Sequence, residues 1–294
     1  MSQHFKSKSL YQNQFLDYEL IDFGKQRKLE RFGTIIVDRP EINATISQQE
    51  KPDVWRNAHW KFEELNPKHG EWKQLKDSPS EWTMTYKLAK PLKIKLKLTQ
   101  FKHIGVFPEQ SENWAYIQFK FKNRPTQKNF LNLFAYTGAA SLVVAQSGAK
   151  VTNVDSVKQI TEWAKSNAVA NKLDNIRWIV EDARKFVLKC ERRGEKFNGI
   201  ILDPPIYGVG TKKEHWKLER DLKGLLKSVS KVMHKKDAFI VLNTYSPKVD
   251  LAQLNAMVSS IDDLPKQFER HNLGLLSNKR KYLPLGQLIR AYRP

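Results

Sequence analysis

Four short apolar runs in the second half of the chain each end at a polar or glycine-containing turn. They lie at 130–134, 150–154, 176–180 and 200–202. Helix-compatible segments alternate with these runs, so each run is interpreted as a buried strand and each segment as a helix. Repeated strand-then-helix units predict right-handed crossovers and an open parallel sheet, a Rossmann-like α/β fold with ligands outside the carboxyl ends of the strands.

The first hundred residues show a different pattern, in which apolar and polar positions alternate with a period of two. Such runs occupy 18–23, 34–37, 82–86 and 94–98. This alternation is typical of short strands that bury one face. We therefore predict a smaller β-rich N-terminal domain at 1–100 and an α/β domain at 101–294.

The ends of the predicted strands carry residues suited to a nucleoside ligand. After the first strand, Gly138 permits close backbone approach, and the N–H groups that open the next helix suit an anionic group. Asp155 follows the second strand, where an acid commonly holds a ribose diol, and Asp182 follows the third strand. The Gly-x-Gly-x-x-Gly pattern is absent, which argues against NAD and FAD. Taken singly, either Asp could instead be a helix N-cap.

The fourth strand ends in Asp203-Pro204-Pro205, with Tyr207 close behind. Two successive prolines stop a strand and offer no backbone N–H, so the turn presents acceptors only. A carboxylate and carbonyls beside an aromatic ring suit a planar base, whose N–H groups they can accept while its face stacks. The alternative is a proline-rich turn after a core strand.

Taken in order, these motifs resemble one enzyme family. Asn132-Leu133-Phe134-Ala135-Tyr136-Thr137-Gly138, followed by Asp155, Asp182 and Asp203-Pro204-Pro205, is similar to class I S-adenosylmethionine-dependent methyltransferases of the YccW-like ribosomal RNA methyltransferase group. The resemblance includes the segment 105–114 and covers about residues 100–294. It is specific for the cofactor and leaves the methyl acceptor open.

The resemblance implies S-adenosyl-L-methionine as the cofactor and a role for each matched position. Residues 132–138 would surround the methionine part, Asp155 would hold the ribose hydroxyls, and Asp182 with the Ala183 backbone would contact the adenine. Asn113 would also lie near the cofactor. The implied cofactor-binding residues are Gln110, Asn132, Phe134, Thr137, Gly138, Asp155, Ser156, Asp182 and Ala183. The residues implied to face the acceptor, as the catalytic set, are Asp203, Pro204, Pro205 and Tyr207.

One position departs from the group. Cytosine-5 methylation needs a nucleophile, usually Cys, and in members with that chemistry the Cys follows the fifth strand, where Tyr245 stands here. The single cysteine, Cys190, lies on a predicted helix without an activating setting. The sequence therefore favours direct transfer to a nitrogen, which needs positioning and a proton acceptor but no covalent step.

The charge of the chain points to a polyanionic partner. Fifty-one Lys and Arg against 31 acids give a formal net charge of +20, which indicates RNA, although a lysine-rich genome would produce the same excess. Lys93, Lys95 and Lys97 alternate on one predicted strand, either as a solvated face or as an edge-protecting one. Trp55, Trp60, Trp72 and Trp82 lie among basic residues. They are interpreted mainly as core, with base stacking as the alternative.

The absence of a signal pattern, a long apolar span and paired cysteines predicts a cytoplasmic protein without a membrane partner. The seven histidines are scattered, so no metal is expected. We predict a methyltransferase that acts on a base in RNA, and the family resemblance implies ribosomal RNA. The alternatives are a protein side-chain methyltransferase and a non-catalytic RNA-binding or assembly factor. The sequence does not predict the oligomeric state.

Overall fold

A computed structural model describes residues 8–11, 17–48, 50–66, 69–88, 90–122, 128–210 and 215–294. The chain forms two compact units. Unit 1 comprises Met1–Ser9, Asn113–Leu273 and Gly286–Pro294, and unit 2 comprises Leu10–Glu112 and Gly274–Leu285. A segment near the carboxyl terminus therefore belongs with the amino-terminal unit. The division at residue 100 stays a prediction.

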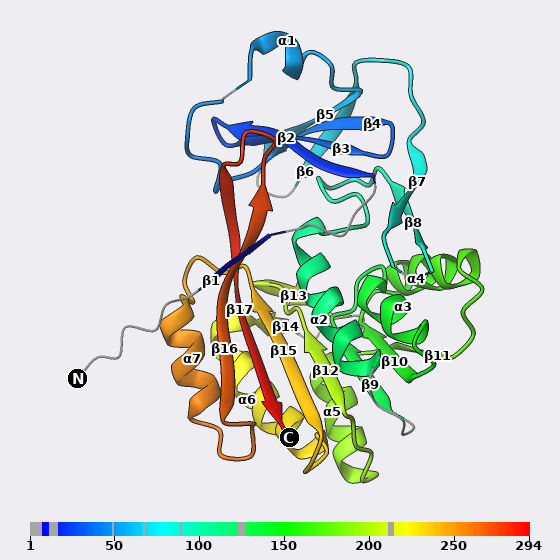
Figure 1. Ribbon diagram of the computed structural model, residues 1–294, viewed down its shortest axis with the longest axis vertical. Helices are drawn as coiled ribbons and strands as arrows, with labels where there is room; N and C mark the ends of the chain where they lie inside the picture. The colour runs from blue at the N-terminus through cyan, green and yellow to red at the C-terminus, as the bar shows by residue number, and fades with distance from the viewer. Residues whose placement is uncertain are drawn as a thin grey trace. The chain divides into compact units, whose positions relative to one another are not determined.

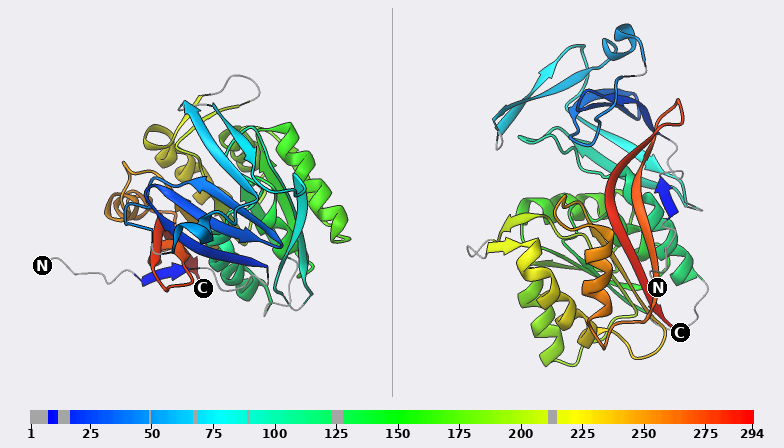
Figure 2. Two further views of the ribbon diagram at one scale, coloured as in Figure 1. Left: turned by 90° about the horizontal axis from the view of Figure 1, so that it is seen from above. Right: turned by 90° about the vertical axis from the view of Figure 1, so that its left-hand side faces the viewer.

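Unit 1 is built on an eight-stranded mixed sheet (Figure 1). Its strands, in spatial order, are β1 (Lys8–Tyr11), β16 (Gln267–Leu276), β17 (Tyr282–Arg293), β15 (Ala238–Thr244), β12 (Gly199–Leu202), β9 (Asn129–Leu133), β10 (Lys150–Asp155) and β11 (Ile176–Val180). The five strands from β15 to β11 run parallel, and β17 is antiparallel to β15. The predicted Rossmann-like sheet is confirmed, with an antiparallel ribbon of β16 and β17 added at one side (Figure 2).

The strand order reverses at β9. The chain passes from β9 to β10 and β11 on one side, then returns to place β12 on the other side of β9. In open α/β sheets, ligands bind outside the carboxyl ends of the two strands that flank such a switch point. Those ends are Leu133 and Leu202, and the next backbone N–H, that of Asp203, lies 3.5 Å from the Leu133 carbonyl oxygen.

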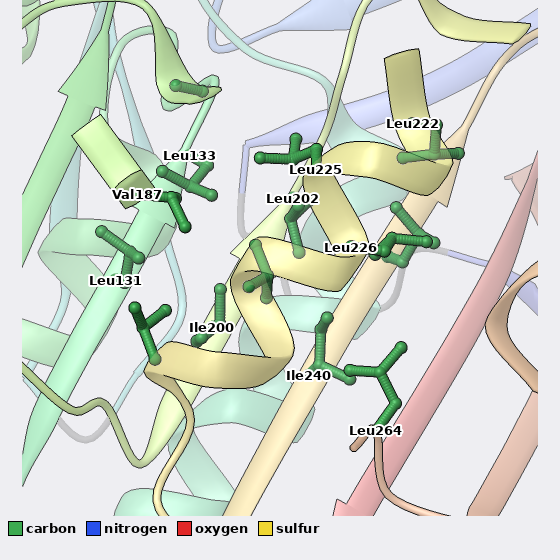
Figure 3. Packing of buried hydrophobic residues seen from close by; sticks show 14 of the residues in the cluster. Leu131, Leu133, Val187, Ile200, Leu202, Leu222, Leu225, Leu226, Ile240 and Leu264 are labelled. Atoms are coloured by element: carbon green, nitrogen blue, oxygen red, sulfur yellow. The ribbon is translucent and has the colours of Figure 1, made fainter. Parts of the chain in front are cut away.

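Helices cover both faces of the parallel strands. They are α2 (Ser111–Lys122), α3 (Ala139–Ala145), α4 (Lys158–Ala170), α5 (Ala183–Arg192), α6 (Leu218–Val232) and α7 (Leu251–Ser259). On one face, leucines of α6 pack over alternate strand residues in a fully buried cluster (Figure 3) that includes Leu131, Leu133, Ile200, Leu202, Ile240, Leu222, Leu225 and Leu226. On the other face, the Phe121 ring of α2 meets Phe130 and Phe239 edge-on. Burial of each such side chain contributes about 1.5–3 kcal/mol, so this packing fixes the strand ends.

Unit 2 is β-rich, as predicted. Its five-stranded sheet contains β2 (Tyr18–Gly24), β3 (Arg27–Phe32), β4 (Ile35–Pro40), β5 (Trp60–Asn66) and β6 (His69–Gln74). A separate two-stranded ribbon consists of β7 (Glu81–Tyr86) and β8 (Leu92–Lys97). Two short helical turns, α1 (Pro52–Trp55) and η1 (Pro108–Gln110), complete the unit.

The four tryptophans of unit 2 are half-buried, and three of them donate hydrogen bonds within that unit. The indole N–H of Trp55 donates to Asp22 at 2.9 Å, that of Trp60 to the Pro79 carbonyl at 3.3 Å, and that of Trp72 to the Thr99 carbonyl at 2.9 Å. These rings therefore anchor loops of unit 2. In the described part of the chain, no helix has the length and apolar character needed to cross a membrane.

Candidate active site

The turn after β9, which we call the glycine loop (residues 134–138), has an unusual backbone. Phe134, Tyr136 and Gly138 have positive φ values of 57°, 50° and 82°. A residue other than glycine in this region costs on the order of 1–3 kcal/mol, and such strain is found preferentially at functional sites. Hydrogen bonds to β10 hold the loop: the Ala135 N–H donates to the Val154 carbonyl at 3.0 Å, and the Tyr136 N–H donates to Asp155 at 2.9 Å.

Gly138 ends this loop where no side chain fits. A Cβ at this position would lie 3.0 Å from the Cβ of Ala164 and 3.4 Å from Oδ1 of Asn153. The preceding carbonyl, of Thr137, accepts a hydrogen bond from the Asn167 amide at 3.1 Å. The loop therefore packs directly on α4, and Gly138 provides the close approach that the sequence predicts.

Asp155 ends β10, beside the glycine loop. One carboxylate oxygen accepts from the Tyr136 N–H and the other from the Val157 N–H, both at 2.9 Å. Burial raises the pKa of Asp155, and these two N–H groups offset the effect only in part. Each carboxylate oxygen can accept a second hydrogen bond, so this half-buried acid fits the two hydroxyl donors of a ribose diol. Ser156, the next residue, is half-buried.

Asp182 is the N-cap of α5. Its carboxylate accepts from the Lys185 N–H at 3.1 Å and forms an ion pair with Arg184 at 3.2 Å. The helix-cap interpretation is thus confirmed for this side chain. Ala183, the first residue of α5, is buried. A contact of Asp182 and Ala183 with adenine stays a prediction.

Asn132 lies inside β9 and is buried. Its side-chain amide donates to the Ser141 hydroxyl at 3.0 Å, and that hydroxyl donates to Oδ1 of Asn153 at 2.7 Å. The three side chains tie β9, β10 and α3 together at the glycine loop. Sequence reasoning missed Ser141 and Asn153, although a polar residue at a buried strand position was a signal for the latter.

The acceptor turn (residues 203–207) follows β12 at the switch point. Pro204 is buried and Pro205 is exposed, while the Tyr207 side chain is 59% exposed and begins β13 (Tyr207–Val209). The Pro205 carbonyl accepts from the indole N–H of Trp216 at 2.6 Å, and the Ile206 carbonyl accepts from the Leu218 N–H at 3.0 Å. The turn and the glycine loop thus follow neighbouring parallel strands, at the carboxyl edge of the sheet.

Two upstream residues have different surroundings. Gln110 is buried in η1, which belongs to unit 2, and its place near the cofactor stays a prediction. Asn113 is fully buried in unit 1, donates to Oδ1 of Asn243 at 2.9 Å and accepts from Arg290 at 3.0 Å. These bonds connect α2 to β15 and β17.

Cys190 has no activating setting, as predicted. The thiol is fully buried on α5 and lies 3.6 Å from Oε2 of Glu195. Burial, with a smaller effect of the Glu195 charge, raises the pKa of Cys190 to about 12. Tyr245 directly follows β15, at the fifth parallel strand end, and is half-buried.

Comparisons with known proteins agree with this geometry. The family model "Conserved hypothetical protein 95" matches residues 115–259. The crystal structure of the SAM-dependent methyltransferase from Agrobacterium tumefaciens is 30% identical, with a TM-score of 0.90 over 100% of this chain and 98% of that one. The structure of SMU.776 complexed with SAH shares the fold, with 18% identity and a TM-score of 0.71 over 95% of this chain and 76% of that one.

A curated relative is the ribosomal RNA large subunit methyltransferase K/L of Shewanella frigidimarina. It is 32% identical over 201 residues, which make up 64% of this chain and 28% of that protein. The match thus spans little more than a quarter of the relative's length. The strand order, the motifs at the strand ends and the full-length similarity to the Agrobacterium enzyme lead to one conclusion: the chain belongs to the class I S-adenosylmethionine-dependent methyltransferases and is related to the K/L-type ribosomal RNA enzymes.

Proposed function

We propose that this methyltransferase modifies a nitrogen on a base in RNA, with ribosomal RNA as the first candidate, and that it acts in the cytoplasm. The observation that carries the proposal is the turn Asp203–Tyr207, whose two prolines offer carbonyls but no N–H, beside the glycine loop at the switch point of the sheet. The curated relatives named for ribosomal RNA methylation and the net charge of +20 support an RNA acceptor.

The residues around the glycine loop fit the cofactor. Asp155 would accept the ribose hydroxyls, residues 132–138 would enclose the methionine part, and Asp182 with the Ala183 backbone would contact the adenine. Ser156 and Gln110 would complete this set. When bound, S-adenosylmethionine supplies a methyl group on a positively charged sulfur, which becomes neutral as the methyl group leaves.

The acceptor turn would orient the base. Asp203 and the Pro204 carbonyl would accept its N–H groups, while the Tyr207 ring would lie against its face. Held in this way, the nitrogen lone pair would face the methyl group, and Asp203 or water would accept the proton that the nitrogen gives up on transfer. The buried Cys190 takes no part in this scheme, and Tyr245 occupies the position of the cysteine nucleophile.

Unit 2 would help to hold the RNA. In β8 the side chains of Lys93 and Lys95 are exposed, while Leu92, Ile94 and Leu96 between and beside them are fully buried. Thr83 and Thr85 of β7 pair with Lys95 and Lys93, so hydroxyl and ammonium groups share one face of the ribbon. Such a face suits phosphate oxygens, which accept from both groups.

The identity of the acceptor is tested by transfer of labelled methyl from S-adenosylmethionine to RNA and protein fractions of cells that lack this protein. We expect label in RNA, and nucleoside mass spectrometry then identifies the modified base. Label confined to protein would favour a side-chain amide, because an acid-Pro-Pro-aromatic turn holds a planar amide equally well. RNA binding without transfer would favour a non-catalytic assembly factor.

A further inference from the structure

Trp216 is a buried aromatic residue in the pair of strands β13 and β14 (His215–Lys217), whose other strand residues are exposed or half-exposed. It lies on β14, which pairs with β13 so that Trp216 is opposite Gly208. Its side chain is 5% exposed, whereas Tyr207 and Val209 on the opposite face of β13 are 59% and 62% exposed. One face of this pair of strands therefore packs on the rest of unit 1, and the other face is exposed to solvent.

Trp216 contacts three segments of the candidate site at once. Its indole N–H donates to the Pro205 carbonyl of the acceptor turn at 2.6 Å. Its ring lies 5.1 Å from the ring of Phe134 in the glycine loop, and 5.7 Å from the guanidinium carbon of Arg184, which follows Asp182 and Ala183.

Arg184 extends these contacts. Its guanidinium pairs with Asp182 at 3.2 Å and with Asp221 of α6 at 3.4 Å, and Asp221 in turn accepts from the backbone N–H of Lys217 at 2.8 Å. Arg184, which follows the predicted adenine contact, is thus connected directly to α6 through Asp221 and indirectly to the end of β14 through Lys217.

The acceptor turn needs such an anchor for a chemical reason. Pro204 and Pro205 have no N–H, so backbone hydrogen bonds can fix these two residues only through their carbonyls. Trp216 donates to one of them, the Pro205 carbonyl, and its ring also packs on Phe134 of the glycine loop. Methyl transfer requires the acceptor and the methyl group to be aligned closely, and misplacement by about 1 Å can lower the rate about 100-fold.

We infer that Trp216 is a positioning residue, which fixes the acceptor turn relative to the glycine loop and thereby aligns acceptor and methyl donor. The test of this inference by turnover rests on the proposed function, whereas its test by amide hydrogen exchange does not. It also predicts that the hydrogen bond, rather than the bulk of the ring, carries the effect.

Two substitutions separate the N–H donor from the ring. Trp216→Phe removes the donor and keeps an aromatic ring, and 3-benzothienylalanine at position 216 keeps the size of tryptophan without the N–H. For both variants we expect turnover about 10-fold lower, from the loss of one hydrogen bond, and cofactor affinity within about twofold of the parent by calorimetry. Hydrogen exchange of the Tyr207 and Gly208 amides should be faster.

Val229→Ala is the matched control, because Val229 is fully buried on α6 and has no part in the site. It should lower the melting temperature while turnover and exchange at the acceptor turn stay unchanged. Unchanged turnover and unchanged amide exchange in the benzothienylalanine variant would overturn the inference. If the parent methylates no RNA, the proposed function fails, while the exchange measurement still decides the role of Trp216.

Discussion

At the scale of single residues, the site depends on half-buried acids at the strand ends, whose oxygens can accept further hydrogen bonds from a ligand. Asp155 illustrates this, since two backbone N–H groups satisfy one acceptor position on each oxygen and the residue is only half-buried. A ligand with two hydroxyl groups could donate one hydrogen bond to each carboxylate oxygen of Asp155.

Asp155→Ala should therefore weaken S-adenosylmethionine binding by about 1–3 kcal/mol, because the ribose hydroxyls lose their acceptor. Calorimetry measures this directly. Asp250→Ala is a suitable control, because Asp250 is an acid that caps α7 in a capping box with Gln253. It should reduce stability by about 1 kcal/mol and leave cofactor affinity unchanged. Equal affinity in a folded Asp155→Ala variant would remove the ribose assignment.

Asp203→Ala should lower turnover far more than cofactor affinity. The proposed contact of Asp203 is with the reacting base, and an interaction that strengthens in the transition state affects the chemical step. Steady-state kinetics at saturating cofactor, together with calorimetry, separate the two effects. Loss of cofactor binding with normal turnover at saturation would show that Asp203 serves the cofactor instead.

Cys190 should behave as an inert thiol. Its pKa of about 12 means that the thiolate, the reactive form, is scarce at pH 8 in the folded protein. Alkylation by iodoacetamide at pH 8 should be slow, rise as the pH approaches 12, and become fast at pH 8 only after unfolding. Cys190→Ser should keep turnover within about threefold, and a fluorinated cytosine substrate should trap no adduct. A trapped adduct at Cys190 would restore cytosine-5 chemistry.

At the scale of elements, the strands of the parallel sheet could be predicted because each is an apolar run that ends at a Gly or Asp turn. The four predicted runs coincide closely with β9, β10, β11 and β12. The hairpin of β13 and β14 could not be predicted in the same way, because its short strands have mixed polarity. The role of Trp216 depends on that pairing, so it became visible only in three dimensions.

The β7–β8 ribbon provides an element-scale prediction. Lys93→Glu with Lys95→Glu should weaken RNA binding and make it less sensitive to salt, because each lost phosphate contact reduces the log–log slope by about 0.7 on single strands. Lys223→Glu with Lys227→Glu, on the exposed side of α6, changes the net charge equally. Equal losses in both double variants would mean that net charge, and not this ribbon, governs RNA affinity.

At the scale of the whole molecule, the excess of basic residues makes a prediction about intact protein. If five or more phosphates are neutralised, RNA affinity should fall with salt with a log–log slope steeper than about −3 on single-stranded RNA. Filter binding at several salt concentrations between about 50 and 200 mM measures this slope. If RNA affinity hardly changed with salt, the +20 charge would be better explained by a lysine-rich genome than by RNA binding.

The assignment of residues to the two units could not be predicted from local patterns. The pattern of apolar and polar residues changes near residue 100, but no local signal indicates that Gly274–Leu285 belongs to the amino-terminal unit. That membership depends on contacts between distant parts of the chain, such as the hydrogen bond from the Asn278 N–H to the Leu20 carbonyl at 3.0 Å.

This connection has a consequence for synthesis on the ribosome. Domains usually fold in order as the chain emerges, but unit 2 needs a segment that is translated close to the end. Residues 10–112 are therefore made well before residues 274–285, with residues 113–273 of unit 1 synthesised in between. Premature termination before residue 274 would remove residues that belong to each of the two units.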